Sequence, residues 1–148
     1  MTGEFVENFT LKDQNGNDFN LYDNLDKKVL LVFYPKDNSP VCSKQLVNYS
    51  TNKKKFDEYG IKAAGVNTES AQSHISFCNS LGIDMPLLID ENKIVSRRFD
   101  ALNILGINKR KLVLIGTDKK ILFEKSSLPV FYFNSEKIIE MLKADKII

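Results

Sequence analysis

Two cysteines, Cys42 and Cys78, and one histidine, His74, are the side chains with the greatest capacity for nucleophilic or metal chemistry. A structural zinc site normally takes four cysteine or histidine ligands, so these three cannot build one alone. The cysteines do not form a C-x-x-C pair, which disfavours a disulfide reductase. In a chain without a visible secretory signal, two cysteines indicate reactive thiols rather than a stabilising disulfide.

Cys42 falls near the expected start of a helix. Ser39 is a favourable N-cap, Pro40 suits the first helical position, and Cys42 then takes the third. The first N–H groups of a helix have no partner within it and the helix dipole is positive there, so a thiolate is stabilised. The thiolate is the nucleophile. The Ser39 hydroxyl could donate a hydrogen bond to the sulfur or to a bound substrate oxygen. From helix position alone, an inert cysteine packed under the first turn is an equally good interpretation.

The segments on either side of Cys42 predict a strand–helix–strand unit. Residues 29–34 are continuously apolar, which is typical of a strand buried on both faces of a sheet. A helix is expected over about residues 40–59, with Gly60 as its stop. Residues 61–66 predict a second strand, and this order implies a parallel crossover.

The remaining segments predict further elements of a layered α/β fold. We expect a hairpin at Asn15-Gly16, a helix over Ala71–Leu81, an extended segment PLLID, a helical turn through NKIVSRRF, an antiparallel hairpin about residues 117–120, and a helix over about residues 135–143. Together they predict one domain over residues 1–148 with a thioredoxin-like fold. Its central mixed sheet is flanked by helices, and the first hairpin is an N-terminal extension.

Composition and charge narrow the function classes. The 148 residues are 43% apolar and 27% charged, an ordinary balance for a compact chain with a hydrophobic core. The net charge of +2 is too small to indicate nucleic-acid binding. There is no apolar run long enough for a membrane span. The beginning MTGEFVENFT lacks the pattern of a secretory signal, so a cytoplasmic location is expected.

Around Cys42 the sequence resembles the peroxiredoxins of the AhpC/TSA superfamily. Pro35, Ser39 and Cys42 match the family signature P-x-x-x-[T/S]-x-x-C, and FYPKDNSPVC is similar to the bacterioferritin-comigratory, or PrxQ, branch. The resemblance extends over the first hairpin, HISFCNSLGI, MPLLIDENKIVSRRF and RKLVLI, which is most of the chain. Val41 stands where the family usually has glycine, a departure that related members tolerate.

The resemblance implies peroxide reduction at Cys42. This cysteine would attack the O–O bond and become a sulfenic acid. The Ser39 hydroxyl would bind the peroxide, and Pro35 would shield the sulfenic acid from further oxidation. Arg110 matches the family's active-site arginine, which favours the thiolate and polarises the peroxide, although outside the family it would be taken for a solvated turn residue. Gln45 matches a family position that is Glu or Gln and would help to hold the arginine.

Cys78 is open to two interpretations. The branch's common resolving position, five residues after the peroxidatic cysteine, is Val47 here. Some members resemble this chain instead and resolve through a cysteine in the later helix. The resemblance therefore implies an intramolecular Cys42–Cys78 disulfide, and its formation would need local unfolding of both helix starts. Alternatively, Ala71, Ile75 and Cys78 form a helical stripe, and Cys78 is only core packing in a one-cysteine peroxidase.

Two other side chains near the cysteines have both structural and functional interpretations. His74 lies one turn before Cys78 and could tune that thiol. A lone histidine on a helix is more often a surface residue, and we expect that for His74. Tyr34 could face the active site, but a tyrosine at a strand end more often serves packing.

The resemblance favours an antioxidant peroxidase for hydrogen peroxide and organic hydroperoxides. Thioredoxin or a similar dithiol protein would recycle it, with no metal, haem or flavin. A peroxide sensor or relay that passes oxidation to a partner protein remains an alternative, as does a non-catalytic thioredoxin-like module. Members of this branch are often monomers, and we see no exposed apolar stripe that argues otherwise. No nucleic-acid or membrane partner is expected.

Overall fold

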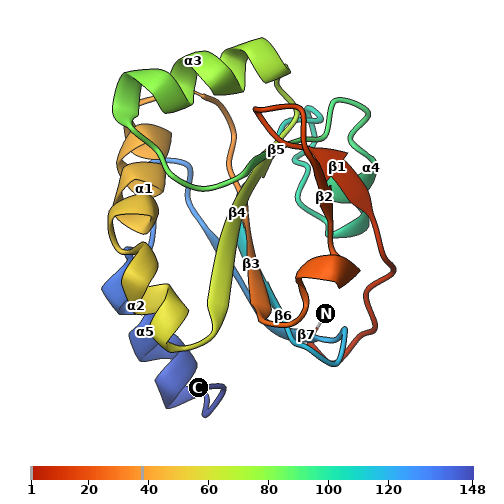
Figure 1. The fold of residues 1–148 in the computed structure, drawn as a ribbon, viewed down its shortest axis with the longest axis vertical. Coiled ribbons are helices and arrows are strands. Elements are labelled where there is room, and N and C mark those ends of the chain that lie inside the picture. The colour runs from red at the N-terminus through yellow and green to blue at the C-terminus, as the bar shows by residue number, and fades with distance from the viewer. Residues whose placement is uncertain (1, 38) are drawn as a thin grey trace.

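The computed structural model describes residues 2–37 and 39–148, which form a mixed sheet with covering elements on both faces (Figure 1). Its five strands are β3 (Lys28–Phe33), β4 (Ile61–Asn67), β5 (Leu87–Ile89), β6 (Arg110–Ile115) and β7 (Ile121–Ser127). The strand order is β5-β4-β3-β6-β7. Strand β4 runs parallel to both β3 and β5, and β6 runs antiparallel to both β3 and β7. The predicted mixed sheet, with its parallel crossover and later hairpin, is confirmed.

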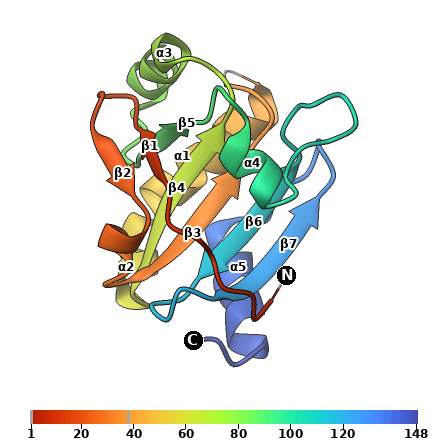
Figure 2. The same cartoon turned by 90° about the vertical axis from the view of Figure 1, so that its right-hand side faces the viewer.

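The covering elements divide between the two faces of the sheet (Figure 2). Helices α1 (Pro40–Thr51), α2 (Lys53–Glu58) and α5 (Ser135–Ala144) cover one face. The other face carries the antiparallel hairpin of β1 (Thr10–Lys12) and β2 (Asp18–Asn20), the short 3-10 helix η1 (Tyr22–Asn24), and α4 (Ile94–Arg98). Helix α3 (Ala71–Leu81) lies across the end of the sheet at which β3 leads into α1. The predicted N-terminal hairpin extension is therefore confirmed.

The helix predicted over residues 40–59 is two helices, because the chain breaks at Asn52. The backbone N–H of Asn52 donates to the Asn48 carbonyl at 3.0 Å, and its side-chain amide donates to the same oxygen at 2.8 Å. Asparagine competes in this way for helical carbonyls and disfavours a helix interior. Both halves keep an apolar side chain in the core, Leu46 from α1 and Phe56 from α2.

The bounds of α3 agree with the prediction at both ends. Ser70 caps its start, with Oγ accepting the backbone N–H of Ser73 at 3.3 Å. Gly82 closes it at a φ of 64°, a left-handed conformation that glycine adopts without steric cost. Among the described residues, no helix combines the length and the apolar composition that crossing a bilayer requires.

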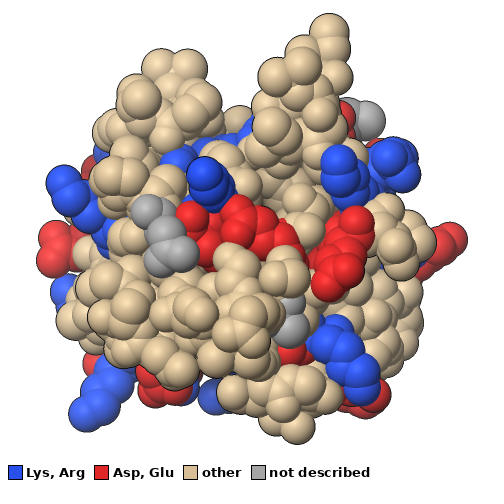
Figure 3. Space-filling model, turned by 90° about the horizontal axis from the view of Figure 1, so that it is seen from above, with Lys and Arg blue, Asp and Glu red and all other residues tan. Residues whose placement is uncertain are grey.

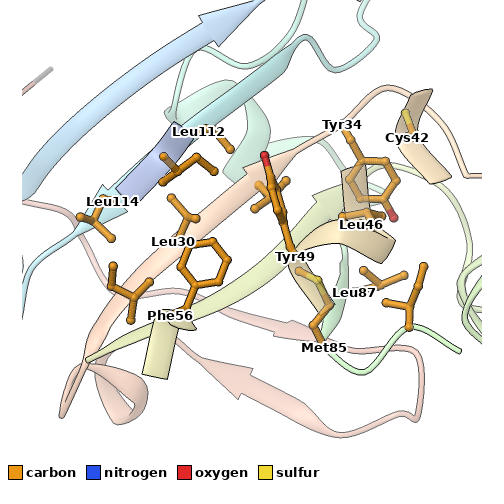
Figure 4. Packing of buried hydrophobic residues seen from close by; sticks show 14 of the residues in the cluster. Leu30, Tyr34, Cys42, Leu46, Tyr49, Phe56, Met85, Leu87, Leu112 and Leu114 are labelled. Atoms are coloured by element: carbon orange, nitrogen blue, oxygen red, sulfur yellow. The ribbon is translucent and has the colours of Figure 1, made fainter. Parts of the chain in front are cut away.

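Each face of the sheet has its own hydrophobic cluster. The cluster on the α1 side contains Leu30, Leu46 and Leu112, and it extends to Tyr34 and Cys42 at one end (Figure 4). Cys42 therefore lies where the buried core meets the end of the sheet that α3 crosses.

Candidate active site

Ser39 caps helix α1 and fixes the backbone that carries Cys42. Its backbone is extended, and its Oγ accepts the backbone N–H of Cys42 at 3.2 Å. Pro40 takes the first helical position, as the sequence predicts. Since the Ser39 oxygen acts as an acceptor in this bond, its own proton stays available to a second partner. Pro35 lies half-buried in the bend that follows β3, in the same connection.

Arg110 reaches Cys42 from the first residue of β6, 68 positions along the chain. Its Nη2 donates to Cys42 Sγ at 3.3 Å, and Nη1 donates to Gln45 Oε1 at 2.6 Å. Nε and Nη2 also donate to the Pro129 carbonyl, at 3.3 and 2.9 Å. Arg110 is only 3% exposed, so it is not the solvated turn residue that local sequence alone indicates. Gln45, Pro129 and Cys42 therefore fix the orientation of the planar guanidinium, whose Nη2 lies against the sulfur.

A chain of buried hydrogen bonds orients Gln45. Its Oε1 accepts from Arg110, and its Nε2 donates to the Tyr49 hydroxyl at 3.1 Å. The Tyr49 hydroxyl in turn donates to the Phe133 carbonyl at 2.6 Å. Burial raises the pKa of Tyr49, so this hydroxyl remains a donor. The role of Tyr49 is not evident from the sequence, although a position four residues after Gln45 on the same helix places the two side chains together.

Cys78 is a buried thiol in the structure, and both cysteines are free. It lies on α3, is 8% exposed, and belongs to the same hydrophobic cluster as Cys42. The Gln14 side chain donates from Nε2 to Cys78 Sγ at 3.5 Å. Burial, with a smaller contribution from the Asp37 charge, raises the pKa of Cys78 to about 11. The Ala71 side chain of the predicted stripe lies outside the described part of the chain.

His74 is fully buried, so the expectation of a surface histidine is wrong. Its Nδ1 lies 2.6 Å from Asp37 Oδ2, and its Nε2 lies 3.3 Å from the Leu88 carbonyl. The carboxylate partner is 37 residues away in the connection before α1, so no local pattern on the helix predicts it. Tyr34 packs in the core as expected, and its hydroxyl also donates to Asp37 Oδ1 at 2.7 Å.

Asp37 is a buried carboxylate that no pattern in the sequence predicts. Burial by itself would raise the pKa of Asp37. The hydrogen bonds from His74, Ser73 and Tyr34 outweigh that effect and leave the pKa below its ordinary value. Asp37 is therefore held ionised in the connection that leads to Cys42.

Exposed apolar side chains lie in two loops near Arg110, contrary to the expectation from sequence. They belong to the segments before β6 and after β7, whose ends are adjacent because Arg110 pairs with Ser127. The most exposed are Ile104, Leu105, Leu128, Val130 and Phe131. Neither segment has the periodicity of a helix or strand, so no stripe is visible in the sequence. Seen from the end that carries α3, charges of both signs lie among uncharged side chains, with acidic atoms near the centre (Figure 3).

Comparison with protein-family models gives a match to the AhpC/TSA family over residues 2–123. Among curated proteins, the chain is similar to the peroxiredoxin bcp of Helicobacter pylori (strain J99). The two are 30% identical over 142 residues, which cover 93% of this chain and 84% of the relative. It is also 37% identical over 93 residues to the chloroplastic peroxiredoxin Q of Arabidopsis thaliana, covering 62% of this chain and 43% of that one.

Solved structures similar to this chain include two from the same branch. The crystal structure of the peroxidoxin BcpB from Mycobacterium tuberculosis superposes with a TM-score of 0.85 at 29% identity, covering 99% of this chain and 97% of that one. A mutant of PrxQ from Xylella fastidiosa superposes with a TM-score of 0.88 at 25% identity, again covering 99% and 97%.

Proposed function

Because the chain belongs to the AhpC/TSA family of peroxiredoxins, we propose that it is a thiol-dependent peroxidase with Cys42 as its peroxidatic cysteine. Its substrates are hydrogen peroxide and organic hydroperoxides, and its role is antioxidant defence. One observation carries the proposal: Arg110 Nη2 lies 3.3 Å from a sulfur held at the capped start of a helix.

The charge of Arg110 supports ionisation of this sulfur. No carboxylate among the described residues forms an ion pair with Arg110. A buried cation is costly unless it meets an opposite charge, and the Cys42 sulfur is the group beside it that can supply one. A thiolate at Cys42 would therefore be favoured by the guanidinium and by the free N–H groups of the first turn.

In the first step the Cys42 thiolate attacks one oxygen of the peroxide. A sulfur–oxygen bond forms and the O–O bond breaks, so that the sulfur loses two electrons and becomes a sulfenic acid. The other oxygen leaves and takes a proton, giving water or an alcohol. The Ser39 oxygen accepts the Cys42 N–H, so the hydroxyl proton can be donated to the bound peroxide. Gln45 holds the arginine, and Pro35 shields the sulfenic acid.

In the second step the Cys78 sulfur displaces hydroxide from the sulfenic acid. The Cys42–Cys78 disulfide forms, the sulfur–oxygen bond breaks, and hydroxide leaves with the thiol proton as water. A thioredoxin-like dithiol then supplies two electrons and two protons to restore both thiols. Because Cys78 is buried on α3, this step requires local opening of that helix.

The proposed enzyme works as one domain over residues 1–148, as a monomer in the cytoplasm. The BcpB and PrxQ structures support the domain assignment, since each aligns with 99% of the chain.

A peroxidase assay coupled to a thioredoxin system tests the proposal. Wild type should turn over both classes of peroxide, and Cys42→Ser should have no activity. Cys78→Ser should complete one oxidation and then fail to recycle through the disulfide. Normal recycling of Cys78→Ser would assign Cys78 to core packing in a one-cysteine enzyme. Full activity of Cys42→Ser would contradict the proposed function.

A further inference from the structure

A buried pair, Asp37 and His74, connects the two segments that carry the cysteines. Asp37 precedes the Ser39 cap by two residues, and His74 lies one helical turn before Cys78. Their side chains meet at 2.6 Å between Oδ2 and Nδ1, and neither is exposed. The described part of the connection between β3 and α1, residues 34–37 and 39, is thereby fastened to α3.

Other hydrogen bonds converge on the same carboxylate. Tyr34 donates to Oδ1 at 2.7 Å, and the Ser73 hydroxyl lies 2.6 Å from Oδ2. The side-chain amide of Asn67, at the end of β4, donates to Oδ1 at 3.5 Å. The backbone N–H of Asp37 donates to Glu69 Oε1 at 3.2 Å. Asp37 is therefore the point at which the connection, the end of β4 and the start of α3 are joined.

Both nitrogens of His74 face acceptors. Nδ1 faces the Asp37 carboxylate, and Nε2 faces the Leu88 carbonyl on β5 at 3.3 Å. The ring is thereby held between the connection before α1 and strand β5. Separating the two side chains takes a hydrogen-bond donor away from the buried Asp37 carboxylate, which is costly.

The disulfide step needs these segments to separate. Cys42 is fully buried at the first turn of α1 with Arg110 on its sulfur, and Cys78 is buried on α3 with Gln14 on its sulfur. To bond, the sulfurs must come within about 2.05 Å. Each must first leave the contact that it makes in the folded protein, Cys42 with Arg110 and Cys78 with Gln14. Movement of α3 away from the connection breaks the Asp37–His74 contact.

We propose that Asp37 and His74 are a positioning pair that sets the rate at which the oxidised Cys42 is resolved by Cys78. Closed, the pair keeps α3, with Cys78 buried on it, fastened to the connection that precedes α1. Open, it frees α3 to present Cys78, whose sulfur forms the disulfide while hydroxide leaves with the thiol proton as water. Neither residue touches the reacting sulfurs, so both act through position. This inference rests on the proposed function.

Separate measurement of the two steps tests the pair. The reduced protein receives one equivalent of hydrogen peroxide, samples are quenched with a thiol-alkylating reagent, and mass spectrometry follows the loss of the Cys42 thiol and the appearance of the disulfide. Asp37→Asn and His74→Gln should each speed disulfide formation about tenfold, since a hydrogen bond to a charged group is lost, and leave the first step unchanged. The double variant should add little to either single one, because both remove the same interaction.

Tyr22→Phe is the matched control. It removes the hydrogen bond from the Tyr22 hydroxyl to the Val6 carbonyl, 2.6 Å long, on the other face of the sheet. It should lower the melting temperature without changing the rate of disulfide formation. Ser73→Ala, which removes one donor to Asp37, should give a smaller acceleration and serves if Asp37→Asn does not fold.

The outcomes separate the pair from the proposed function. If the wild type closes the disulfide but the Asp37 and His74 variants close it no faster and only melt earlier, the pair is structural and the inference is wrong. Fully additive effects in the double variant would also overturn it. If the wild type forms no Cys42–Cys78 disulfide, the resolving step of the proposed function fails, and the inference fails with it.

Discussion

At the scale of single residues, the structure brings together most of the side chains that the family signature points to. Ser39, Gln45 and Arg110 lie where the resemblance placed them, each with a direct contact to Cys42 or to a neighbour of it. The contact between Asp37 and His74 was not predicted, because the two residues lie 37 positions apart in the sequence. A buried polar contact of this kind leaves no periodicity in either segment, so only the folded chain reveals it.

Arg110→Ala should slow the first oxidation of Cys42 about a hundredfold or more, as when one donor to a developing charge is removed. Arg110→Lys should recover only part of the rate, because an ammonium cannot bond Gln45, Pro129 and the sulfur in one plane. Rapid-mixing kinetics with hydrogen peroxide measure both. The control is Arg98→Ala, an exposed arginine on α4. Equal rates for Arg110→Ala and wild type would remove Arg110 from the mechanism.

Cys78 should be slow to alkylate in the reduced, folded protein. Its thiol is buried with a pKa of about 11, so the reactive thiolate is scarce at neutral pH and increases until the pH passes that value. Iodoacetamide labelling from pH 7 to about 10, read by mass spectrometry of the Cys78 peptide, measures this. Gln14→Ala should slow labelling further, since the Gln14 contact opposes the rise. A labelling rate that levels off near pH 8.5, the ordinary value, would contradict the prediction.

At the scale of elements, the order of strands and helices followed from hydrophobic pattern and terminal residues. The C-terminal end of α3 was predicted because Gly82 stops the helix through its left-handed conformation. The break between α1 and α2 was not predicted. The apolar residues on both sides of Asn52 keep the spacing of one helix, whereas the Asn52 side chain interrupts it by bonding the Asn48 carbonyl.

The start of α1 should be sensitive to the loss of its cap. Ser39→Ala removes the acceptor of the Cys42 N–H and should lower the free energy of unfolding by about 1 kcal/mol. It should also slow peroxide reduction, because the hydroxyl that can donate to the substrate is lost. Urea denaturation and the peroxidase assay measure the two effects. Ser39→Thr keeps the hydroxyl and should keep both properties; a Thr variant as impaired as the Ala variant would count against the cap.

The junction of the connection with α3 should weaken in acid. Folding lowers the pKa of Asp37. Burial raises this pKa, but the hydrogen bonds from His74, Ser73 and Tyr34 to the carboxylate lower it by more. Its stabilising contribution is therefore complete above the unfolded pKa of about 3.9 and is lost as the pH falls through the lower folded value. Urea midpoints from pH 6 down to about 3 should fall less for Asp37→Asn than for wild type. Parallel curves for the two proteins would contradict this.

At the scale of the whole molecule, the fold brings together residues that are distant in the sequence. The antiparallel pairing of β6 with β3 places Arg110 at the end of the sheet from which α1 starts, 68 residues from Cys42. The layered α/β class could be predicted because each segment carries its own pattern. The exposed apolar side chains near Arg110 could not, since they become neighbours only where β6 and β7 pair.

The most direct test of the central claim compares the folded and unfolded chain in one variant. Cys78→Ser is treated with one equivalent of hydrogen peroxide, natively and in denaturing urea, and mass spectrometry locates the added oxygen. We expect one oxygen on Cys42, as a sulfenic acid that dimedone traps, at a native rate at least about a hundredfold above the unfolded one. Equal rates in the two states, or native protein that leaves the peroxide unconsumed, would contradict it.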